Sequence, residues 1–240
     1  MNVVGDLVAR GRRSDSLAIQ TERRAGSASY NAFCTTAWKA GNLLTHYGVR
    51  PGATVAIDWG DGVSLHPLTA FFGSALLGAT AQFDPADTVD ASALVAPADR
   101  LHAYDPAPGT KVLGYGDVPD DPEVAGFERD VWSENPTEPP ETVSATATAL
   151  SADDRQFTHE HLLTATERVA TDAGLDRDDS VIVRTSVTNP ETFVAGVLAP
   201  LVVGATILVD QSATGDVAVT ASGASELRTI DPKTVELSDT

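Results

Sequence analysis

Apolar and polar residues alternate along most of the chain with the periods of helices and strands. Residues 30–47 and 160–173 each place apolar side chains every three or four positions, which predicts two amphipathic helices. The β-branched stretches Thr54–Ile57 and Ser180–Val183 predict short buried strands. Each strand is followed by a strongly apolar helix and a second strand, at 67–77 and 80–83 and again at 192–203 and 206–209. Strands that alternate with helices in this way indicate parallel βαβ units and an α/β fold.

The two groups of elements resemble copies of one unit. The turn and strand at 49–57 align with 175–183 at an offset of 126 positions, and at the same offset both copies enter their second strand through Gly-Ala-Thr. A glycine, Gly48 or Gly174, follows the first helix of each copy, where a left-handed residue ends a helix most easily. We therefore predict two related, mostly parallel sheets flanked by helices.

The predicted halves are residues 1–143 and 144–240, packed together as one compact unit. Residues 84–143 form an irregular connection within the first half that is rich in Asp and Pro. We expect short strands in this connection and near the end of the chain, and one acidic surface loop. The strands are expected at 93–95, 101–104, 111–113, 217–220 and 228–230, and the loop at 117–140.

Charge sets this chain apart from an average soluble protein. Thirty-four acidic residues, 23 of them Asp, oppose 16 basic ones, and the net charge is −18. Only three lysines are present, Lys39, Lys111 and Lys233. High salt screens the repulsion of such a surface, so this balance is typical of a halophile's cytoplasmic proteins. The alternative is an acidic surface with a function of its own. Either way, the charge argues against binding to nucleic acid, which needs clustered Lys and Arg.

The apolar fraction of 42% and the mean hydropathy of −0.06 are sufficient for a buried core. No stretch is long and apolar enough to span a bilayer, so we expect no membrane insertion. The first ten residues carry Asp6 and no apolar core of a signal peptide, which also favours a cytoplasmic protein.

The usual catalytic and metal-binding motifs are absent from the sequence. Cys34 is the only cysteine and is predicted to be a buried apolar residue. His159 and His161 are two positions apart and do not share a helical face, so no metal site is assigned to them. Neither Gly-x-Ser-x-Gly nor Gly-x-Gly-x-x-Gly occurs after a predicted strand. The loop Asp58–Gly62 follows a strand where α/β sheets bind ligands, but an exposed turn with a packed Trp59 is the favoured interpretation.

The order of these elements resembles the N-terminal domain of the acyl-CoA synthetases and related adenylate-forming ligases. In the first copy the residues that carry the resemblance are Tyr30-Asn-Ala-Phe33, Gly48-Val-Arg-Pro-Gly52 and Leu76-Leu-Gly-Ala79. In the second copy they are Thr158-His-Glu-His-Leu-Leu163 and Leu198-Ala-Pro-Leu-Val-Val-Gly-Ala-Thr206. Each motif is weak alone, but their order and spacing extend the resemblance over about residues 3–209.

The sequence departs from the family where ATP would bind. A loop rich in Ser, Thr and Gly, ending in Pro-Lys-Gly, precedes the Thr-His of the family, and its backbone N–H groups hold the phosphates. Here Ala147–Phe157 occupies that place, contains neither glycine nor lysine, and carries Asp153 and Asp154. The stretch Ser186–Pro190 lacks the histidine that the family often has near its acyl pocket. The sequence also ends before the family's Tyr-Gly-x-Thr-Glu motif, its ribose-binding Asp and its catalytic lysine.

These observations leave two hypotheses open. The first is a non-catalytic module that binds an acyl, nucleotide or CoA-like ligand or a protein partner. The second is an adenylating ligase fragment, weakly active or completed by a separate chain, for which ATP or AMP and CoA would be the cofactors. The resemblance assigns no catalytic residue and no metal ligand. If a nucleotide binds, it implies Ser151, Arg155, Thr158 and His159 as its contacts.

Overall fold

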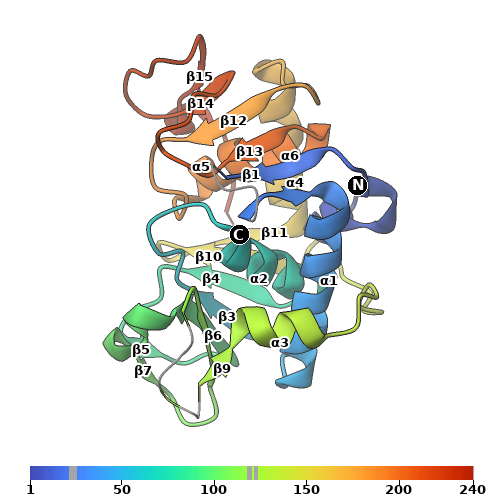
Figure 1. The fold of residues 1–240 in the computed structure, drawn as a ribbon, viewed down its shortest axis with the longest axis vertical. Coiled ribbons are helices and arrows are strands. Elements are labelled where there is room, and N and C mark those ends of the chain that lie inside the picture. The colour runs from blue at the N-terminus through green and yellow to red at the C-terminus, as the bar shows by residue number, and fades with distance from the viewer. Residues whose placement is uncertain (22–25, 118–120, 122–123, 240) are drawn as a thin grey trace.

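Two sheets enclose a layer of helices in the computed structural model of the chain, which describes residues 1–21, 26–117, 121 and 124–239 (Figure 1). The seven-stranded sheet has the order β11 (Arg155–Thr158), β10 (Thr148–Ala152), β4 (Thr80–Phe83), β3 (Thr54–Ile57), β6 (Ala93–Pro97), β8 (Lys111–Tyr115), β9 (Ala125–Gly126). The six-stranded sheet has the order β15 (Arg228–Ile230), β14 (Val217–Val219), β12 (Ser180–Val183), β13 (Thr206–Leu208), β1 (Leu17–Gln20), β2 (Ala28–Ser29). A small third sheet pairs β5 (Thr88–Val89) with β7 (Asp105–Pro106).

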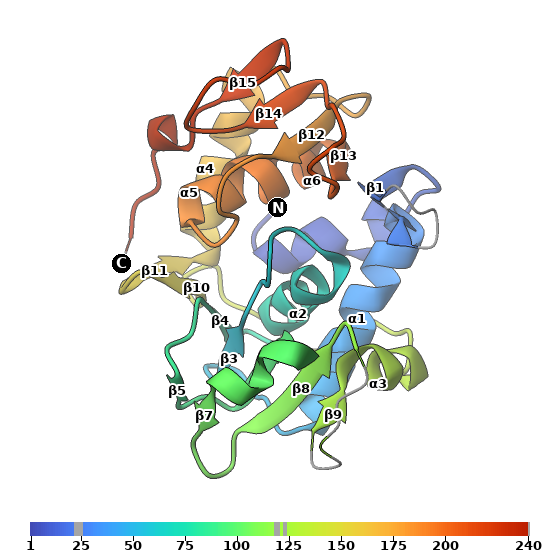
Figure 2. The same cartoon turned by 60° about the vertical axis from the view of Figure 1, so that its left-hand side comes forward.

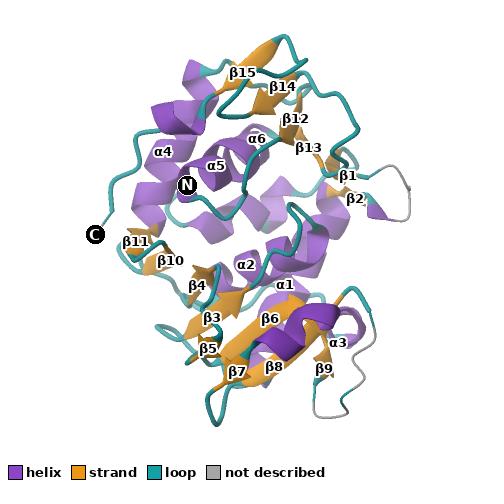
Figure 3. Ribbon diagram, turned by 90° about the vertical axis from the view of Figure 1, so that its left-hand side faces the viewer, coloured by secondary structure: helices purple, strands orange, loops and turns teal. Residues whose placement is uncertain are grey.

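Most of the helices lie between the two large sheets, as Figure 3 shows. These are α1 (Tyr30–His46), α2 (Leu65–Leu76), α4 (His159–Asp172), and the continuous run of α5 (Pro190–Phe193), π-helix η5 (Val194–Leu198) and α6 (Ala199–Val203). The remaining helices are α3 (Phe127–Ser133) and the 3₁₀ helices η1 (Val4–Val8), η2 (Arg10–Arg12), η4 (Ala98–Ala103) and η6 (Pro232–Thr234). The inner faces of both sheets and these helices share one buried apolar cluster.

The predicted repeat is confirmed by strand order and register. Reading from the hairpin edge, β11-β10-β4-β3-β6-β8 in one sheet corresponds to β2-β1-β13-β12-β14-β15 in the other. Thr54 pairs with Thr80, and Ser180 pairs with Thr206, which are the same two positions shifted by 126. Within these two six-strand sets, only β1–β2 and β10–β11 are antiparallel. The mostly parallel α/β architecture is therefore as predicted.

Each half contributes its hairpin to the sheet of the other half. Strand β1 pairs with β13 through Ile19 and Ile207, whereas β10 pairs with β4 through Leu150 and Ala81. The boundary predicted after residue 143 therefore does not separate the two sheets. Hydrophobic periodicity could locate both hairpins, but it carries no information on which sheet edge each hairpin joins.

Glycines set how closely the central helices approach one another and the sheets. A Cβ on Gly73 of α2 would lie 2.8 Å from the backbone nitrogen of Gly41 of α1, so these helices touch backbone to backbone. A Cβ on Gly196 of the π-helix would lie 2.4 Å from Cγ2 of Val183 on β12. The glycines predicted at helix ends adopt positive φ, with values of 94° at Gly48 and 57° at Gly174.

Two predictions in the connection were wrong. Residues 101–104 form no strand, because η4 occupies Ala98–Ala103. Leu101 and Tyr104 are three positions apart, and both pack on the outer face of the seven-stranded sheet. Residues 117–140 are not one loop: β9 and α3 lie within them, and part of the range falls outside the described residues. Helix α3 forms because Phe127 and Val131, four positions apart, are both buried.

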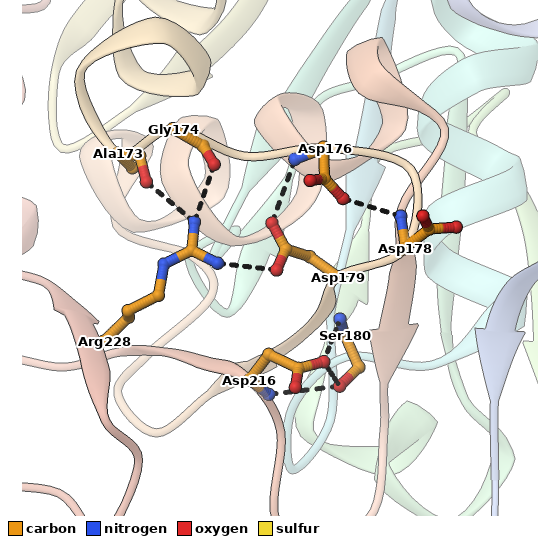
Figure 4. A network of polar contacts seen from close by, with 8 residues as sticks. All are labelled: Ala173, Gly174, Asp176, Asp178, Asp179, Ser180, Asp216 and Arg228. Carbon is orange, nitrogen blue, oxygen red and sulfur yellow. Dashed lines mark hydrogen bonds and ion pairs between the residues drawn. The ribbon is translucent and has the colours of Figure 1, made fainter.

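A polar network holds the turn from α4 to β12 (Figure 4). Arg228 of β15 forms an ion pair with Asp179 at 2.6 Å and donates to the carbonyl oxygens of Ala173 and Gly174, both at 2.8 Å. Asp179 in turn accepts from the backbone N–H of Asp176 at 2.9 Å. The last strand of the sheet is thereby tied to the end of α4. No helix among the described residues is long and apolar enough to cross a membrane.

Candidate functional site

The segment that takes the place of the phosphate loop is a closed β-hairpin. Strands β10 and β11 pair from Ala152 and Arg155 outward, which leaves Asp153 and Asp154 as a two-residue turn. Their φ values are 52° and 60°, the pair of positive angles that a type I′ turn requires. Asp tolerates this left-handed backbone better than most non-glycine residues. The backbone between the strands therefore turns directly and forms no open loop that could surround a phosphate.

Arg155, the one cation of this hairpin, is already paired. Its guanidinium forms ion pairs with Glu191 at 2.7 Å and Asp239 at 3.4 Å, and donates to the carbonyl oxygen of Leu237 at 3.1 Å. The same group stacks 4.7 Å from the ring centre of Phe157. Two carboxylates thus balance its charge, so a phosphate would have to displace them to gain a contact.

Thr158 and His159 are structural residues of the hairpin–helix junction. Thr158 is buried and its Oγ1 accepts from the backbone N–H of His161 at 3.1 Å, which caps α4. His159 is fully buried and its Nδ1 accepts from the backbone N–H of Val4 at 3.1 Å. Its Nε2 has no hydrogen-bond partner within the described residues. Burial lowers the pKa of His159 to about 4, so the ring is neutral near pH 7.

Ser151 lies on β10, half-buried, opposite Gln156 of β11 and beside Gln82 of β4. The hairpin thus contains or adjoins all four residues that the resemblance implied as nucleotide contacts. Ser151, Arg155, Thr158 and His159 remain predicted contacts, and the structure shows other partners for the side chains of the last three.

A crevice lies where the two halves meet, at the carboxyl ends of β3, β12 and β13. The loop from β3 to α2 rises toward the six-stranded sheet (Figure 2) and divides the crevice into two adjoining cavities of 360 and 340 Å³. Trp59–Val63 and Gln211 line both cavities. Residues Val183–Thr188 complete the first cavity. This is the position where open parallel sheets bind ligands.

Hydrogen bonds fix the first-half wall of the crevice. The carboxylate of Asp58 accepts from the backbone N–H of Gly60 and the hydroxyl of Tyr104, both at 2.8 Å. Tyr115 donates to the carbonyl oxygen of Asp58 at 2.8 Å. Burial raises the pKa of both tyrosines, so they remain donors at neutral pH. Asp58 is thus an internal anchor of the loop.

The second-half wall is held by Arg184. Its guanidinium pairs with the buried carboxylate of Glu226 and donates to the carbonyl oxygens of Gln211 and Ala213, both at 2.8 Å. Gln211 donates back to the carbonyl oxygen of Val183 at 2.9 Å. The guanidinium of Arg184 is therefore already hydrogen-bonded. The next two residues, Thr185 and Ser186, are exposed and line the crevice.

Trp59 joins the crevice to an aromatic cluster from both halves. Its ring centre lies 5.1 Å from that of Phe83 and 5.5 Å from that of Phe193. Trp59 is 2% exposed, which confirms the predicted packing of this residue. Its buried Nε1–H has no acceptor among the described residues. A buried donor without an acceptor is energetically unfavourable.

The crevice includes residues that the sequence did not point to. Thr185 follows a strand and carries no motif, and Gln211 comes from a different strand end, whereas Ser186 belongs to the stretch compared above with the family's acyl pocket. Only their shared position after parallel strands of one sheet could have indicated them. In the described part of the chain, no three His, Cys, Asp or Glu side chains are grouped as metal ligands would be.

No family model and no curated protein sequence matches the chain, but solved structures do. An anthranilate CoA ligase, AuaEII, solved with anthranoyl-AMP, is 16% identical with a TM-score of 0.76, over 91% of this chain and 49% of that one. A benzoate CoA ligase from Burkholderia xenovorans is 17% identical with a TM-score of 0.76, over 91% and 50%. The N-terminal domain of FACL13 from Mycobacterium tuberculosis is 14% identical with a TM-score of 0.74, over 92% and 63%.

These likenesses show the fold. The chain has the architecture of the N-terminal domain of acyl-CoA ligases, as the sequence resemblance implied, and it spans about half the length of the two full ligases.

Proposed function

We propose that this chain is a ligand-binding module that holds a small carboxylic acid or acyl group and does not form an acyl adenylate. The two-residue turn at Asp153 and Asp154 carries this proposal. Phosphate binding by backbone N–H groups needs a loop whose amides converge on the ligand. A type I′ turn between paired strands offers no such loop, and its two carboxylates repel a triphosphate.

The crevice between the halves supports a binding role. Its two cavities lie in the size range of small-ligand pockets and share the loop Trp59–Val63 as a wall. Thr185 adds a hydroxyl group on the opposite wall, where the hydroxyl of Ser186 already forms a hydrogen bond with that of Thr188 at 2.7 Å. Two of the solved ligases named above act, by their names, on anthranilate and benzoate, both small aromatic acids.

The second hypothesis, a ligase fragment that a further segment or chain completes, is favoured by one observation. The fold match extends over 91% of this chain to a ligase solved with an acyl adenylate. In that case ATP or AMP and CoA would bind, and the ion pairs of Arg155 would have to open.

Thermal melting in 2 M KCl separates the two hypotheses. We expect benzoate, anthranilate or octanoate to raise the melting temperature, and ATP, AMP and CoA to leave it unchanged. A ligand at 100 times its Kd adds about 2.7 kcal/mol to the free energy of unfolding. The paired variant Thr185→Val with Ser186→Ala, at exposed positions, should reduce the shift caused by the acid. The proposal would be overturned if ATP raised the melting temperature only when Arg155 is present and no acid raised it.

A further inference from the structure

A second, separate groove lies on the opposite side of α1 from its contact with η1, between α1, α3 and the start of α2. Its volume is 480 Å³, larger than either cavity of the crevice, with which it shares no lining residue. We call it the α1–α3 groove. It is lined by Arg13, Ser29, Asn31, Ala32, Thr35, Thr36, Lys39, Leu65, His66, Thr69, Phe127, Glu128, Val131 and Trp132.

The floor of the α1–α3 groove is apolar and its edge carries an exposed tryptophan. Phe127 and Val131 of α3 are 1% and 4% exposed and face α1 from below the groove. Trp132 is 82% exposed, while Trp38 and Trp59 are 1% and 2% exposed. A large aromatic ring left in water beside an apolar groove is the type of residue that anchors a ligand or partner.

Trp132 is held at this edge rather than loosely attached. The ammonium group of Lys39 donates to the carbonyl oxygen of Trp132 at 2.6 Å and lies 5.9 Å from the centre of its ring. Helix α1 presents Ala32, Thr35 and Lys39 on one face, because they are three and four positions apart. The groove therefore lies along this face of α1.

The charge of the groove is the reverse of the charge of the chain. The chain has a net charge of −18, yet Glu128 is the one acidic residue among the lining residues. Glu128 accepts hydrogen bonds from Nε2 of His66 at 2.9 Å and from the backbone N–H of Gly116 at 3.1 Å. Arg13 and Lys39 remain as cations beside the apolar floor. In a protein that is acidic nearly everywhere, this combination selects for an apolar ligand with a negative end.

We propose that the α1–α3 groove binds a single-chain amphiphile that has one carboxylate and an unbranched aliphatic tail. The tail lies along Phe127, Val131 and the ring of Trp132, and the carboxylate lies between Arg13 and Lys39. The open side of the groove, where Ala32 and Trp132 are exposed, allows the ligand to enter without rearrangement. This site does not depend on the function proposed for the crevice.

Decanoate is the probe, and Trp132 is the built-in reporter. Because it is the one tryptophan exposed to solvent, acrylamide quenching reports on its side chain. In 1 M KCl, below the micelle-forming concentration, decanoate should shift the emission to shorter wavelength and protect it from quenching. Decyltrimethylammonium has the same tail and the opposite charge, and should bind at least tenfold more weakly. Equal binding of the two amphiphiles would overturn the charge argument, and no binding of decanoate would overturn the site.

Variants at exposed or half-buried positions locate the site without disturbing the core. Arg13→Gln with Lys39→Met should weaken decanoate about fivefold, since exposed ion pairs contribute modestly. Lys233→Met removes a lysine remote from the groove and should have no effect. Ala32→Phe should fill the groove and abolish binding.

Calorimetry with Trp132→Phe checks that the fluorescence change reports binding. We expect decanoate to bind this variant with a measurable but reduced affinity. Unchanged affinity of Ala32→Phe for decanoate would contradict the proposal. So would loss of decanoate binding in Thr185→Val with Ser186→Ala but not in the groove variants, which would place the ligand in the crevice.

Discussion

Ser29–Tyr30 and Thr158–His159 occupy equivalent places in the two halves, where a hairpin ends and the first helix begins. In both, the first residue caps the helix, with Ser29 accepting from the N–H of Ala32 and Thr158 from that of His161. In both, the second residue inserts a ring into the other half. The hydroxyl of Tyr30 donates to Ala205 at 2.7 Å, and Nδ1 of His159 accepts from Val4.

The difference between the two junctions lies in their protonation. Burial raises the pKa of Tyr30, so its hydroxyl remains a donor across the accessible pH range. Burial lowers the pKa of His159 to about 4, so only the second junction changes charge in acid. Thr158 and His159 thus correspond in position to Ser29 and Tyr30 of the first half, and they remain predicted nucleotide contacts.

Salt is expected to have the largest effect, and it tests whether the halves unfold together. Residues 1–143 contain 19 acidic and 10 basic residues, and residues 144–240 contain 15 and 6, so each part has a net charge of −9. Below a few hundred millimolar KCl this repulsion is poorly screened, and we expect cooperative folding to be lost. Because the hairpins are exchanged, one transition is expected by circular dichroism. Melting curves that are identical in 0.1 and 3 M KCl would contradict this prediction.

Acid should weaken the second junction alone. The folded-state pKa of His159 is about 4, below its ordinary value of 6.5, so the unfolded chain binds more protons between these values. The stabilisation of the folded state by neutral His159 is complete above pH 6.5. It is lost as the pH falls, so the free energy of unfolding decreases by about 3 kcal/mol at pH 4. His159→Asn retains an acceptor for the N–H of Val4 but does not titrate. Urea unfolding of the variant should depend less steeply on pH, whereas Tyr30→Phe should leave the dependence as in the wild type. Parallel curves for wild type and His159→Asn would be inconsistent with a neutral buried histidine.

The second helices of the halves differ in what their glycines touch. Gly73→Ala places Cβ against the backbone of Gly41, so α1 and α2 must separate, at a cost of about 2 to 3 kcal/mol. The Cβ of Gly196→Ala meets side chains rather than backbone: it would lie 2.4 Å from Cγ2 of Val183 and 3.5 Å from Cγ2 of Val219. Adding Val183→Ala should therefore restore part of the free energy of unfolding that Gly196→Ala removes, as measured by urea unfolding. Rescue of Gly73→Ala by a side-chain truncation in α1 would show that the backbone contact is not the cause.

The two helix-to-strand turns provide the smallest expected difference. Arg228 joins three chain segments through Asp179 and two carbonyl groups, whereas Arg50 bonds only carbonyl groups of its own turn, those of Thr45 and Val49. Arg228→Ala should lower the free energy of unfolding by about 1 to 2 kcal/mol and Arg50→Ala by about 0.5 kcal/mol. Equal effects in denaturant titrations would mean that the network of Figure 4 adds no stability.

Periodicity and composition predicted the repeated units because buried strands and apolar helices leave local patterns. The registers of Thr54 with Thr80 and of Ser180 with Thr206 agree with the offset of 126 positions. The exchange of hairpins was not predicted because it depends on contacts between segments distant in sequence. The 3₁₀ helix at Ala98–Ala103 and the closed turn at Asp153 were not predicted because short turns leave no hydrophobic period. The crevice likewise combines strand ends that are distant in sequence.

Acyl-adenylate formation tests the central claim most directly. The purified chain in high salt, with Mg²⁺, ATP, CoA and a panel of carboxylic acids, should release no pyrophosphate above a control without protein. The turn at Asp153 and Asp154 offers no cradle of N–H groups, and Arg155 is already paired with Glu191. Release of pyrophosphate that disappears when Arg155 and Thr158 are replaced together would contradict the account and establish the ligase hypothesis.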